Sequence, residues 1–441
     1  MLRPLIAVLI GSATLNAQAA DLVQVYQQAL ANDAQYASAR AALAAGRERI
    51  PQGRSLLLPT VGMNGSSTHN DNEFTPFNAG QPGSPGASSA ASANGNTNSY
   101  NLTLSQPLFR WANWQQYQQS KLAQAGAEAQ FAQAQQDLIT RVAQAFFDVL
   151  TAQDNLGATQ AQKVATTEQL ASAKRNFEVG TQTITDTHEA QAAYDLVVAQ
   201  EFAALNDLDL KRNALQTIIG QAPAALAPLR TGVTLGAPQP AVIEPWVASA
   251  EQQNYGVVGA QLALESATRD IQRNRAGHYP TLDLVANAGH STTSAYGKTN
   301  NNAIGVQWNM PLFNGFAVTS RVRESIALED KARNDLESAR RNASQGARQA
   351  YLGVHSGLAQ VKALEAAEVS SKSALESNKL GYQVGVRINI DVLNAQRQLY
   401  ATQKDLAKAR YDTIVNGLRL KSAAGTLQEA DLAPVNALLV K

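Results

Sequence analysis

Apolar residues recur at helical spacing over most of this chain, and the two longest such stretches contain no proline. These stretches are residues 110–177 and 314–380, and at 1.5 Å per residue each predicts a helix about 100 Å long. Shorter helices are predicted over residues 21–49, 186–219, 246–275 and 391–424. One leading and one returning helix placed end to end match one long helix. The pattern therefore predicts a rod four helices wide.

Before each long helix, the pattern changes to the alternation of a β-hairpin. Leu282 and Leu284 flank Asp283, so apolar and polar side chains point to opposite faces. We predict hairpins at about residues 59–107 and 280–311. One hairpin alone is more typical of an ordinary half-buried sheet, but two matched hairpins favour the strands of a transmembrane barrel.

Loops and prolines separate these elements. Residues 70–98 and 291–302 are rich in Gly, Ser, Thr and Asn, so we predict a loop within each hairpin, the first of them long and mobile. Pro107 and Pro311 follow the hairpins. We expect each proline in the first turn of a long helix, where a missing N–H costs nothing.

The chain repeats itself with a shift of about 205 residues. Residues 177–180 (FEVG) return as 382–385 (YQVG), and residues 106–109 (QPLF) return as 310–313 (MPLF). A duplication of this size predicts two like halves, so each site is present in two copies whose differences are informative. We assign a first repeat to residues 21–220, a proline-rich linker to 221–245, a second repeat to 246–425 and a tail to 426–441.

The first twenty residues have the pattern of an export signal. Arg3 precedes an apolar stretch, and residues 17–19 (AQA) form a small-residue cleavage site, so the mature chain is expected from Ala20 or Asp21. After the signal, no run of about eighteen apolar residues predicts a membrane helix. The net charge of +1 offers no bulk attraction for nucleic acid, and the absence of cysteine excludes disulfides.

Four strands per chain predict an oligomer. In a bilayer every backbone polar group needs a partner, so the sheet must close, and its two free edges must pair with other copies of the chain. Two chains supply eight strands and three supply twelve, and both numbers are allowed. Small residues on the inward face favour the wider barrel. The residues by themselves leave dimer and trimer open.

No motif for catalysis is present in the sequence. The five histidines form no pair with metal-binding spacing, and no phosphate-binding glycine motif occurs. We therefore expect no enzyme activity and no cofactor. The competing class is a helical rod without a channel, such as a periplasmic adaptor or an adhesin. An adaptor would carry a compact β-domain between its helices, and this chain shows no pattern for one.

Several motifs resemble those of the TolC-like outer-membrane efflux and type I secretion channels. The resemblance covers essentially the whole mature chain and is densest over residues 381–432. It includes residues 57–59 (LLP), 278–280 (HYP), 382–385 (YQVG), 390–393 (IDVL), 409–411 (ARY) and 425–427 (GTL). The resemblance implies a mainly α protein with a small β part. In this family a homotrimer builds one barrel in outer-membrane lipid, with four strands per chain, and one helical tunnel in the periplasm.

The resemblance also implies partners and cargo. Such channels dock a periplasmic adaptor and an inner-membrane transporter at their helix tips. They export drugs, other small molecules or secreted proteins, and the inner-membrane partner selects the cargo. Nucleic acid is not an expected partner.

Two tips are predicted, each at a glycine that ends a long helix. Gly180 and Gly385 are expected in the left-handed conformation that caps a helix. Asp186 has the position of a helix N-cap, with Glu189 completing a capping box, and Asp391 has the same position in the second copy. Capping and gating are compatible roles for Asp186.

By position, the resemblance implies a periplasmic gate at these tips. Tyr382 would bond Asp186, and Arg387 would bond Thr185, which would hold the tips shut. The two copies differ here, because Gln182 stands in the first copy where the second has Arg387.

The resemblance further implies a constriction ring. The family carries two carboxylates one turn apart, of which Asp391 matches the first, while Asn394 stands at the second. A trimer then presents one ring of three aspartates instead of two rings. Because acidic rings select cations, we expect weaker cation selectivity and weaker block by multivalent cations than in a channel with both rings.

Overall fold

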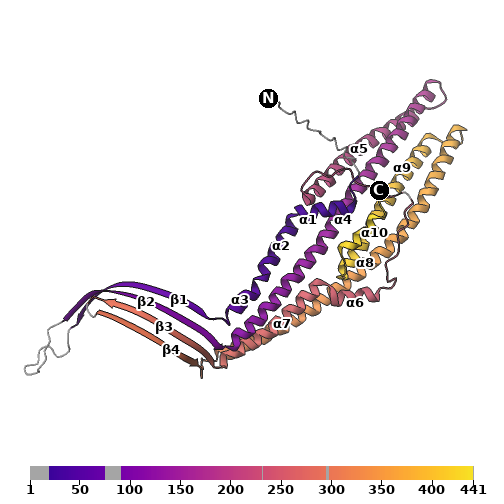
Figure 1. The fold of residues 1–441 in the computed structure, drawn as a ribbon. Helices are drawn as coiled ribbons and strands as arrows, with labels where there is room; N and C mark the ends of the chain where they lie inside the picture. Colours follow the sequence, from indigo (N-terminus) through magenta and orange to yellow (C-terminus); the bar gives the residue numbers. More distant parts are fainter. Residues whose placement is uncertain (1–18, 75–90, 231, 295–296, 441) are drawn as a thin grey trace, which may run out of the picture. The chain divides into compact units, whose positions relative to one another are not determined.

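The computed structural model describes residues 19–74, 91–230, 232–294 and 297–440, so nearly all of the expected signal segment lies outside the described residues (Figure 1). The first repeat contains α1 (Leu22–Asn32), α2 (Ala34–Arg47), α3 (Arg49–Ser55), β1 (Thr60–Phe74), β2 (Ala91–Phe109), α4 (Trp111–Glu178) and α5 (Ile184–Ile219). The second contains α6 (Glu244–Gln253), α7 (Tyr255–Arg275), η1 (Ala276–His278), β3 (Thr281–Thr293), β4 (Gly297–Asn309), α8 (Ala317–Gln383) and α9 (Asn389–Ala423). The tail forms η2 (Glu429–Asp431) and α10 (Leu432–Asn436).

The mainly helical fold with a small sheet is confirmed. The long helices α4 and α8 and the returning helices α5 and α9 begin and end within a few residues of the predicted positions. Ala, Gln and Leu, which lose little side-chain freedom in a helix, dominate α4. The described part of the chain contains no helix that is both long and apolar enough to cross a bilayer.

Each leading helix is interrupted at a capping side chain, which the helical periodicity did not predict, and the first is broken again at Glu48, between α2 and α3. α1 gives way at Asp33 and α6 at Asn254, where the backbone is extended with ψ of 118° and 128°. The side chain of Asp33 accepts a hydrogen bond from the N–H of Tyr36 at 2.6 Å, and that of Asn254 accepts one from Gly256 at 2.9 Å. Short side chains with an oxygen cap helices in this way because they reach the unpaired N–H groups of the first turn.

A left-handed glycine packs against each interruption. Gly220 ends α5 with φ +73°, and Gly425 follows α9 with φ +76°. A Cβ on Gly220 would lie 2.9 Å from the Cβ of Asn32, and a Cβ on Gly425 would lie 2.3 Å from the carbonyl oxygen of Gln253. The two repeats therefore share one kind of junction between a returning and a leading helix. Only glycine allows both the positive φ and the close approach of the neighbouring helix at this junction.

The four strands form one antiparallel sheet in the order β1-β2-β3-β4 (Figure 1). The pairing of β2 with β3 joins the hairpins of the two repeats. The strands are longer than predicted, and the additional paired residues are 70–74, 91–98, 291–293 and 297–302. The predicted loops were too long because backbone pairing continues through Asn, Ser and Gly without any help from side-chain packing. Residues 75–90 of the first expected loop lie outside the described residues.

One face of the sheet carries a continuous apolar row. Val61 of β1 pairs with Leu104 of β2, which pairs with Ala286 of β3. Ala286 in turn pairs with Ile304 of β4. Because directly paired residues point to the same face, the predicted alternation extends across all four strands. Val61 and Ile304 are 64% and 77% exposed, which is typical of strands whose apolar face meets lipid.

The two prolines lie outside the helices, so the expected first-turn position was wrong. Pro107 is inside β2, where the ladder to β3 shifts its register between Pro107 and Phe109. Pro311 follows the end of β4, and α8 begins only at Ala317. Proline lacks the N–H that a regular ladder requires, and an irregularity in the pairing accommodates it.

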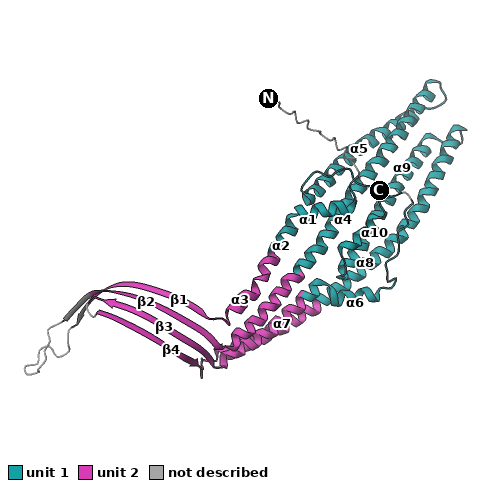
Figure 2. Ribbon diagram, viewed as in Figure 1, with its two compact units in different colours: residues 1–41, 130–258, 339–441 teal, residues 42–129, 259–338 magenta. Residues whose placement is uncertain are grey.

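The chain divides into two compact units that cut across the repeats (Figure 2). Unit 2 holds the sheet and comprises residues 42–129 and 259–338, and unit 1 comprises 1–41, 130–258 and 339–441. Unit 1 contains the main core, in which Phe146 and Phe147 of α4 are buried. Phe147 stacks on Tyr411 of α9 with 5.5 Å between ring centroids. This core joins α4 of the first hairpin, α9 of the second hairpin and the C-terminal tail.

Candidate functional site

The first hairpin tip begins where α4 ends. Gly180 has the expected left-handed conformation, with φ +78°. Its N–H donates to the carbonyl of Phe177 at 3.0 Å, and the N–H of Thr181 donates to that of Asn176 at 2.9 Å. These two bonds satisfy the last carbonyls of the helix and reverse the chain.

The returning helix α5 is capped by Thr183, not by Asp186. The N–H of Asp186 donates to the Thr183 hydroxyl at 3.4 Å, and the N–H of Thr183 donates to the Asp186 carboxylate at 3.2 Å. The hydroxyl of Thr183 also donates to that carboxylate at 2.8 Å. This is a capping box with Asp186 as its third residue. The expected box of Asp186 with Glu189 was therefore displaced by three residues.

The second tip has the same turn but a different cap. Gly385 has φ +78°, and the N–H of Val386 donates to the carbonyl of Gly381 at 2.8 Å. Ile388 precedes α9 and offers no side-chain cap, so the capping role expected for Asp391 was wrong. The carboxylate of Asp391 lies 3.7 Å from the guanidinium of Arg387 instead. A negative charge in the first turn of a helix is favourable even without a capping bond.

The two tips touch through Tyr382. Its hydroxyl donates to the side-chain oxygen of Gln182 at 2.8 Å. Within one chain, the structure therefore brings Tyr382 to the other tip, but to a different residue from the expected Asp186. Thr185 is exposed, and within the described residues the Arg387 guanidinium pairs with Asp391, not with Thr185.

Asn389 is a tip residue that the sequence reasoning missed. It is fully buried, its amide donates to the carbonyl of Asp186 at 3.0 Å, and it accepts from Gln169 of α4 at 2.6 Å. It thus ties the start of α9 to α4 and to the first turn of α5. A difference between the two copies could have pointed to it, because Asn389 stands where the first copy, 205 positions earlier, has the apolar Ile184.

Two arginines lie beside the two residues that we expect at the constriction. Arg397 donates to the amide oxygen of Asn394, and Arg387 faces Asp391. Each acceptor along this turn of α9 therefore has an arginine beside it. Among the described residues, no group of three or more His, Cys, Asp or Glu side chains is placed to hold a metal ion.

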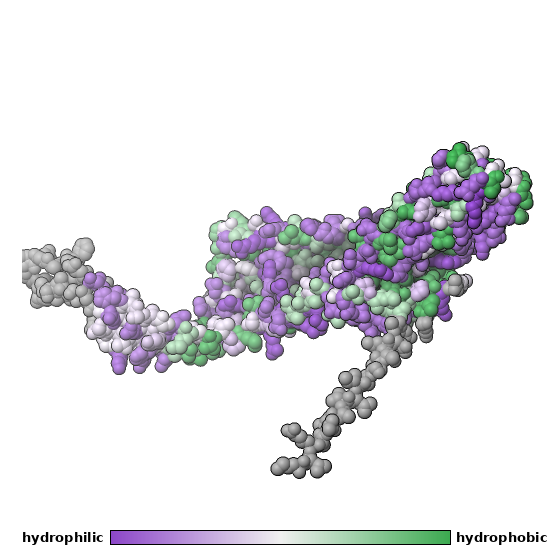
Figure 3. Space-filling view, turned by 90° about the horizontal axis from the view of Figure 1, so that it is seen from above, coloured by the Kyte–Doolittle hydropathy of each residue, from purple (hydrophilic) through white to green (hydrophobic). Residues whose placement is uncertain are grey.

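Large apolar side chains are exposed at both tips. Figure 3 shows hydrophobic surface at this end of unit 1. These exposed residues, which we call the tip apolar surface, are Phe177, Val179, Ile184, Val384, Val386 and Ile388. Clustered exposed apolar side chains of this kind are typical of interaction surfaces.

Comparison with known proteins places the whole chain in one family. A family model described as Outer membrane efflux protein matches residues 25–221 and 246–426. The chain is 35% identical over 435 residues to the outer membrane protein TolC of Vibrio cholerae, covering 97% of this chain and 96% of that protein. It is 30% identical over 434 residues to the alkaline protease secretion protein AprF of Pseudomonas aeruginosa, covering 96% and 88%.

Solved structures show the same fold. The outer membrane protein VceC of Vibrio cholerae has a TM-score of 0.77 at 19% identity, covering 92% of this chain and 96% of that chain. A membrane protein from Pseudomonas aeruginosa has a TM-score of 0.80 at 19% identity, covering 93% and 91%. Together with the tips and the sheet described above, these similarities show that the chain belongs to the outer membrane efflux protein family, the TolC-type channels of the outer membrane.

Proposed function

We propose that three copies of this chain form one conduit, with a twelve-strand barrel in the outer membrane and a helical tunnel in the periplasm. The sheet carries this proposal. Its order leaves β1 and β4 as edges, and the apolar row runs from one edge to the other. Pairing β4 of one copy with β1 of the next satisfies every backbone group once the ring closes.

The conduit exports cargo that an inner-membrane transporter and a periplasmic adaptor deliver to the tips. The tip apolar surface supports this, because its large apolar side chains are exposed in the described part of the chain and offer a docking face. Relatives are named for protein secretion, such as PrtF of Dickeya chrysanthemi at 29% identity. Others are named for efflux, such as BepC of Brucella suis at 27% identity. We propose small molecules, drugs or secreted proteins as cargo.

Contacts between the tips hold the conduit closed at rest. The bond from Tyr382 to Gln182 supports this latch, and the bonds of Tyr382 to Asp186 and of Arg387 to Thr185 are proposed for the assembled trimer. Each such bond contributes about 0.5–1.5 kcal/mol, and more when one partner is charged. Three chains together supply several kcal/mol, while moving a gate from 1:99 to 99:1 takes about 5.5 kcal/mol.

Planar-bilayer recording of the purified protein tests conduit and latch separately. Wild-type protein should insert as discrete channels and migrate differently on a gel before and after heating. The Tyr382→Phe, Arg387→Ser double variant should conduct more and should sensitise cells to large antibiotics. Tyr400→Phe is the matched control, because its hydroxyl bonds the carbonyl of Ala161 at 3.2 Å away from the tips. Wild-type behaviour of the double variant would contradict the latch, and failure to insert would contradict the conduit.

A further inference from the structure

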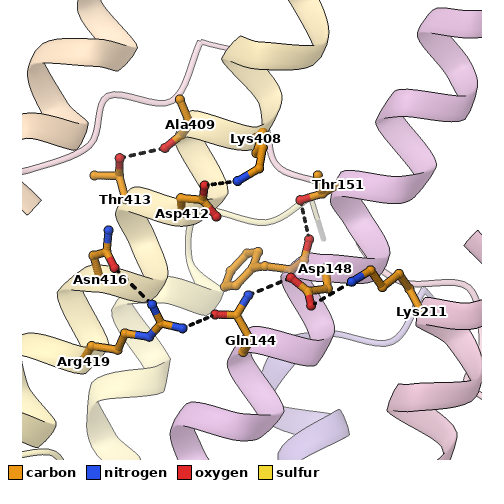
Figure 4. Close-up of polar contacts among 11 residues, drawn as sticks. Gln144, Asp148, Thr151, Lys211, Lys408, Ala409, Asp412, Thr413, Asn416 and Arg419 are labelled. Atoms are coloured by element: carbon orange, nitrogen blue, oxygen red, sulfur yellow. Dashed lines mark hydrogen bonds and ion pairs between the residues drawn. The ribbon is translucent and has the colours of Figure 1, made fainter. Parts of the chain in front are cut away.

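A cleft of about 530 Å³, with several charged side chains in its lining, opens in unit 1 between α4, α5 and α9. Its charged lining residues are Arg141 and Asp148 of α4, Lys211 of α5 and Arg419 of α9. Figure 4 shows that the last three and Gln144 point toward one another from the three helices. We call this feature the cationic cleft, because three of its four charged side chains are positive.

The side chains of the cationic cleft form one chain of contacts. Arg419 donates to Gln144 at 2.8 Å, and the amide of Gln144 donates to Asp148 at 2.6 Å. Asp148 then lies 3.5 Å from the ammonium of Lys211. On its other side, Arg419 donates to the amide oxygen of Asn416 at 3.5 Å. Its guanidinium is therefore held by two neutral amides, and no carboxylate of the described chain is recorded in an ion pair with it.

The remaining charges do not cancel this excess. Arg141 is matched by Asp33, which lies behind it and is buried. Asp148 pairs with Lys211, so within the described residues the cleft offers Arg419 no carboxylate of its own. Elsewhere on α9, Lys421 pairs with Asp431 at 2.7 Å, and Lys408 pairs with Asp412 at 2.5 Å. An arginine positioned by amides and short of a carboxylate retains free donors for an incoming oxyanion.

The cleft lies mainly on the side of α4 that faces away from the core, with Ala145 at the border between them. Val142, Phe146 and Val149 are buried in the core, whereas Arg141, Gln144 and Asp148 line the cleft. On α9, Arg419 follows the predicted ring residue Asp391 by 28 residues, or four heptads, a spacing that keeps both on one stripe when the helix supercoils at 3.5 residues per turn. If the proposed conduit holds, on which this step rests, the cleft faces the same lumen as the ring.

We propose that the cationic cleft binds an oxyanion group, a phosphate, sulfonate or carboxylate, of a solute inside the tunnel. Arg419 and Lys211 supply the charge, and Gln144 fixes the guanidinium. The volume of about 530 Å³ admits a small multivalent anion. A trimer presents three such clefts at one level, well beyond the constriction. The ring at the tips attracts cations, so the cleft gives the tunnel a second subsite of opposite preference.

Inorganic tripolyphosphate is the probe, applied to the full-length trimer. In planar bilayers it should reduce the wild-type current, and by calorimetry it should bind the detergent-solubilised trimer. Arg419→Gln keeps an amide near Gln144 but removes the charge. It should weaken both block and binding on the order of tenfold, as expected for loss of one charge-assisted contact. Lys211→Gln should act in the same direction.

Lys408→Gln is the matched control. It removes one positive charge from the same helix, in a side chain that is 63% exposed and already paired, so block and binding should stay close to wild type. Equal loss in Lys408→Gln and Arg419→Gln would show diffuse lumen charge and overturn the site. Loss in Arg397→Gln with none in Arg419→Gln would assign the anion to the constriction and also overturn it. Calorimetry detects binding without conduction, so the cleft and the conduit can fail independently.

Discussion

The guanidinium of Arg110 donates two hydrogen bonds to the carboxylate of Asp283, from Nε to Oδ1 at 2.8 Å and from Nη2 to Oδ2 at 2.7 Å. Arg110 connects β2 to α4, and Asp283 lies in β3 opposite Pro107. The pair therefore fastens the hairpin of the first repeat to that of the second. Asp283 is 8% exposed, and a two-point contact with arginine replaces the water it has lost.

Breaking this pair should weaken the joined sheet. Because Arg110 is 40% exposed, we expect a coupling energy of about 1–2 kcal/mol between Arg110→Gln and Asp283→Asn, below the full cost of a buried pair. The measurement is a double-mutant cycle on the urea midpoint of the trimer. Strictly additive losses in the two variants would show that the contact does not stabilise the sheet.

Gly425→Ala should destabilise the protein more than Gly180→Ala. Both glycines have nearly the same φ, +76° and +78°, so an alanine costs about 1–2 kcal/mol at either position for its conformation. A Cβ at Gly180 meets nothing within 4 Å, whereas one at Gly425 meets the backbone of Gln253 at 2.3 Å. The difference between the two melting temperatures measures the clash alone. Equal losses would mean that the junction yields without cost.

The pair of Asp33 with Arg141 should make stability depend on pH. Burial raises the pKa of Asp33, but the two bonds from Arg141 and the N–H of Tyr36 outweigh it and hold the pKa below 3.8. A carboxyl group whose pKa is lower in the folded state stabilises the fold at pH values above its unfolded pKa of about 4. This stabilisation is lost as the pH falls through the folded pKa. Asp33→Asn should therefore cost about 2 kcal/mol near pH 7 and progressively less below about pH 4.

Urea unfolding of wild type and Asp33→Asn between pH 8 and pH 3 checks this dependence. Asn254 is the matching residue of the second repeat, and it bonds the carbonyl of Ala423 at 3.0 Å without a charge. Asn254→Ala is therefore the control, and its cost should not change with pH. A gap for Asp33→Asn that stays constant down to pH 3 would refute the ion-pair contribution.

Arg397 should limit the effect of restoring the second acidic ring. Asn394→Asp adds three carboxylates to a trimer, but each one meets the guanidinium that now bonds Asn394. We predict that Asn394→Asp alone raises cation selectivity and cation block less than Asn394→Asp combined with Arg397→Gln. Reversal potentials in a salt gradient measure both, with Asp391→Ala as the variant of lowest selectivity. No change in selectivity or block for either variant would discount the ring.

Sequence periodicity determined the helices, the strands and the repeat of this protein. Helical spacing, strand alternation and left-handed glycines act over a few neighbouring residues, so α4, α8 and the turns at Gly180 and Gly385 could be recognised without a structure. The helix interruptions at Asp33 and Asn254 were not predicted. Each depends on one capping side chain and on one glycine packed against it, and neither feature changes the hydrophobic periodicity.

Only the tertiary structure decided which side chains meet. Arg110 and Asp283 are 173 residues apart and come together through the register of β2 on β3. Within one chain, Tyr382 meets Gln182, while the Asp186 carboxylate belongs to the capping box of Thr183. The sequence determined the elements since their hydrogen bonds are local. Contacts between elements depend on helix phase and strand register, which packing across the whole chain sets.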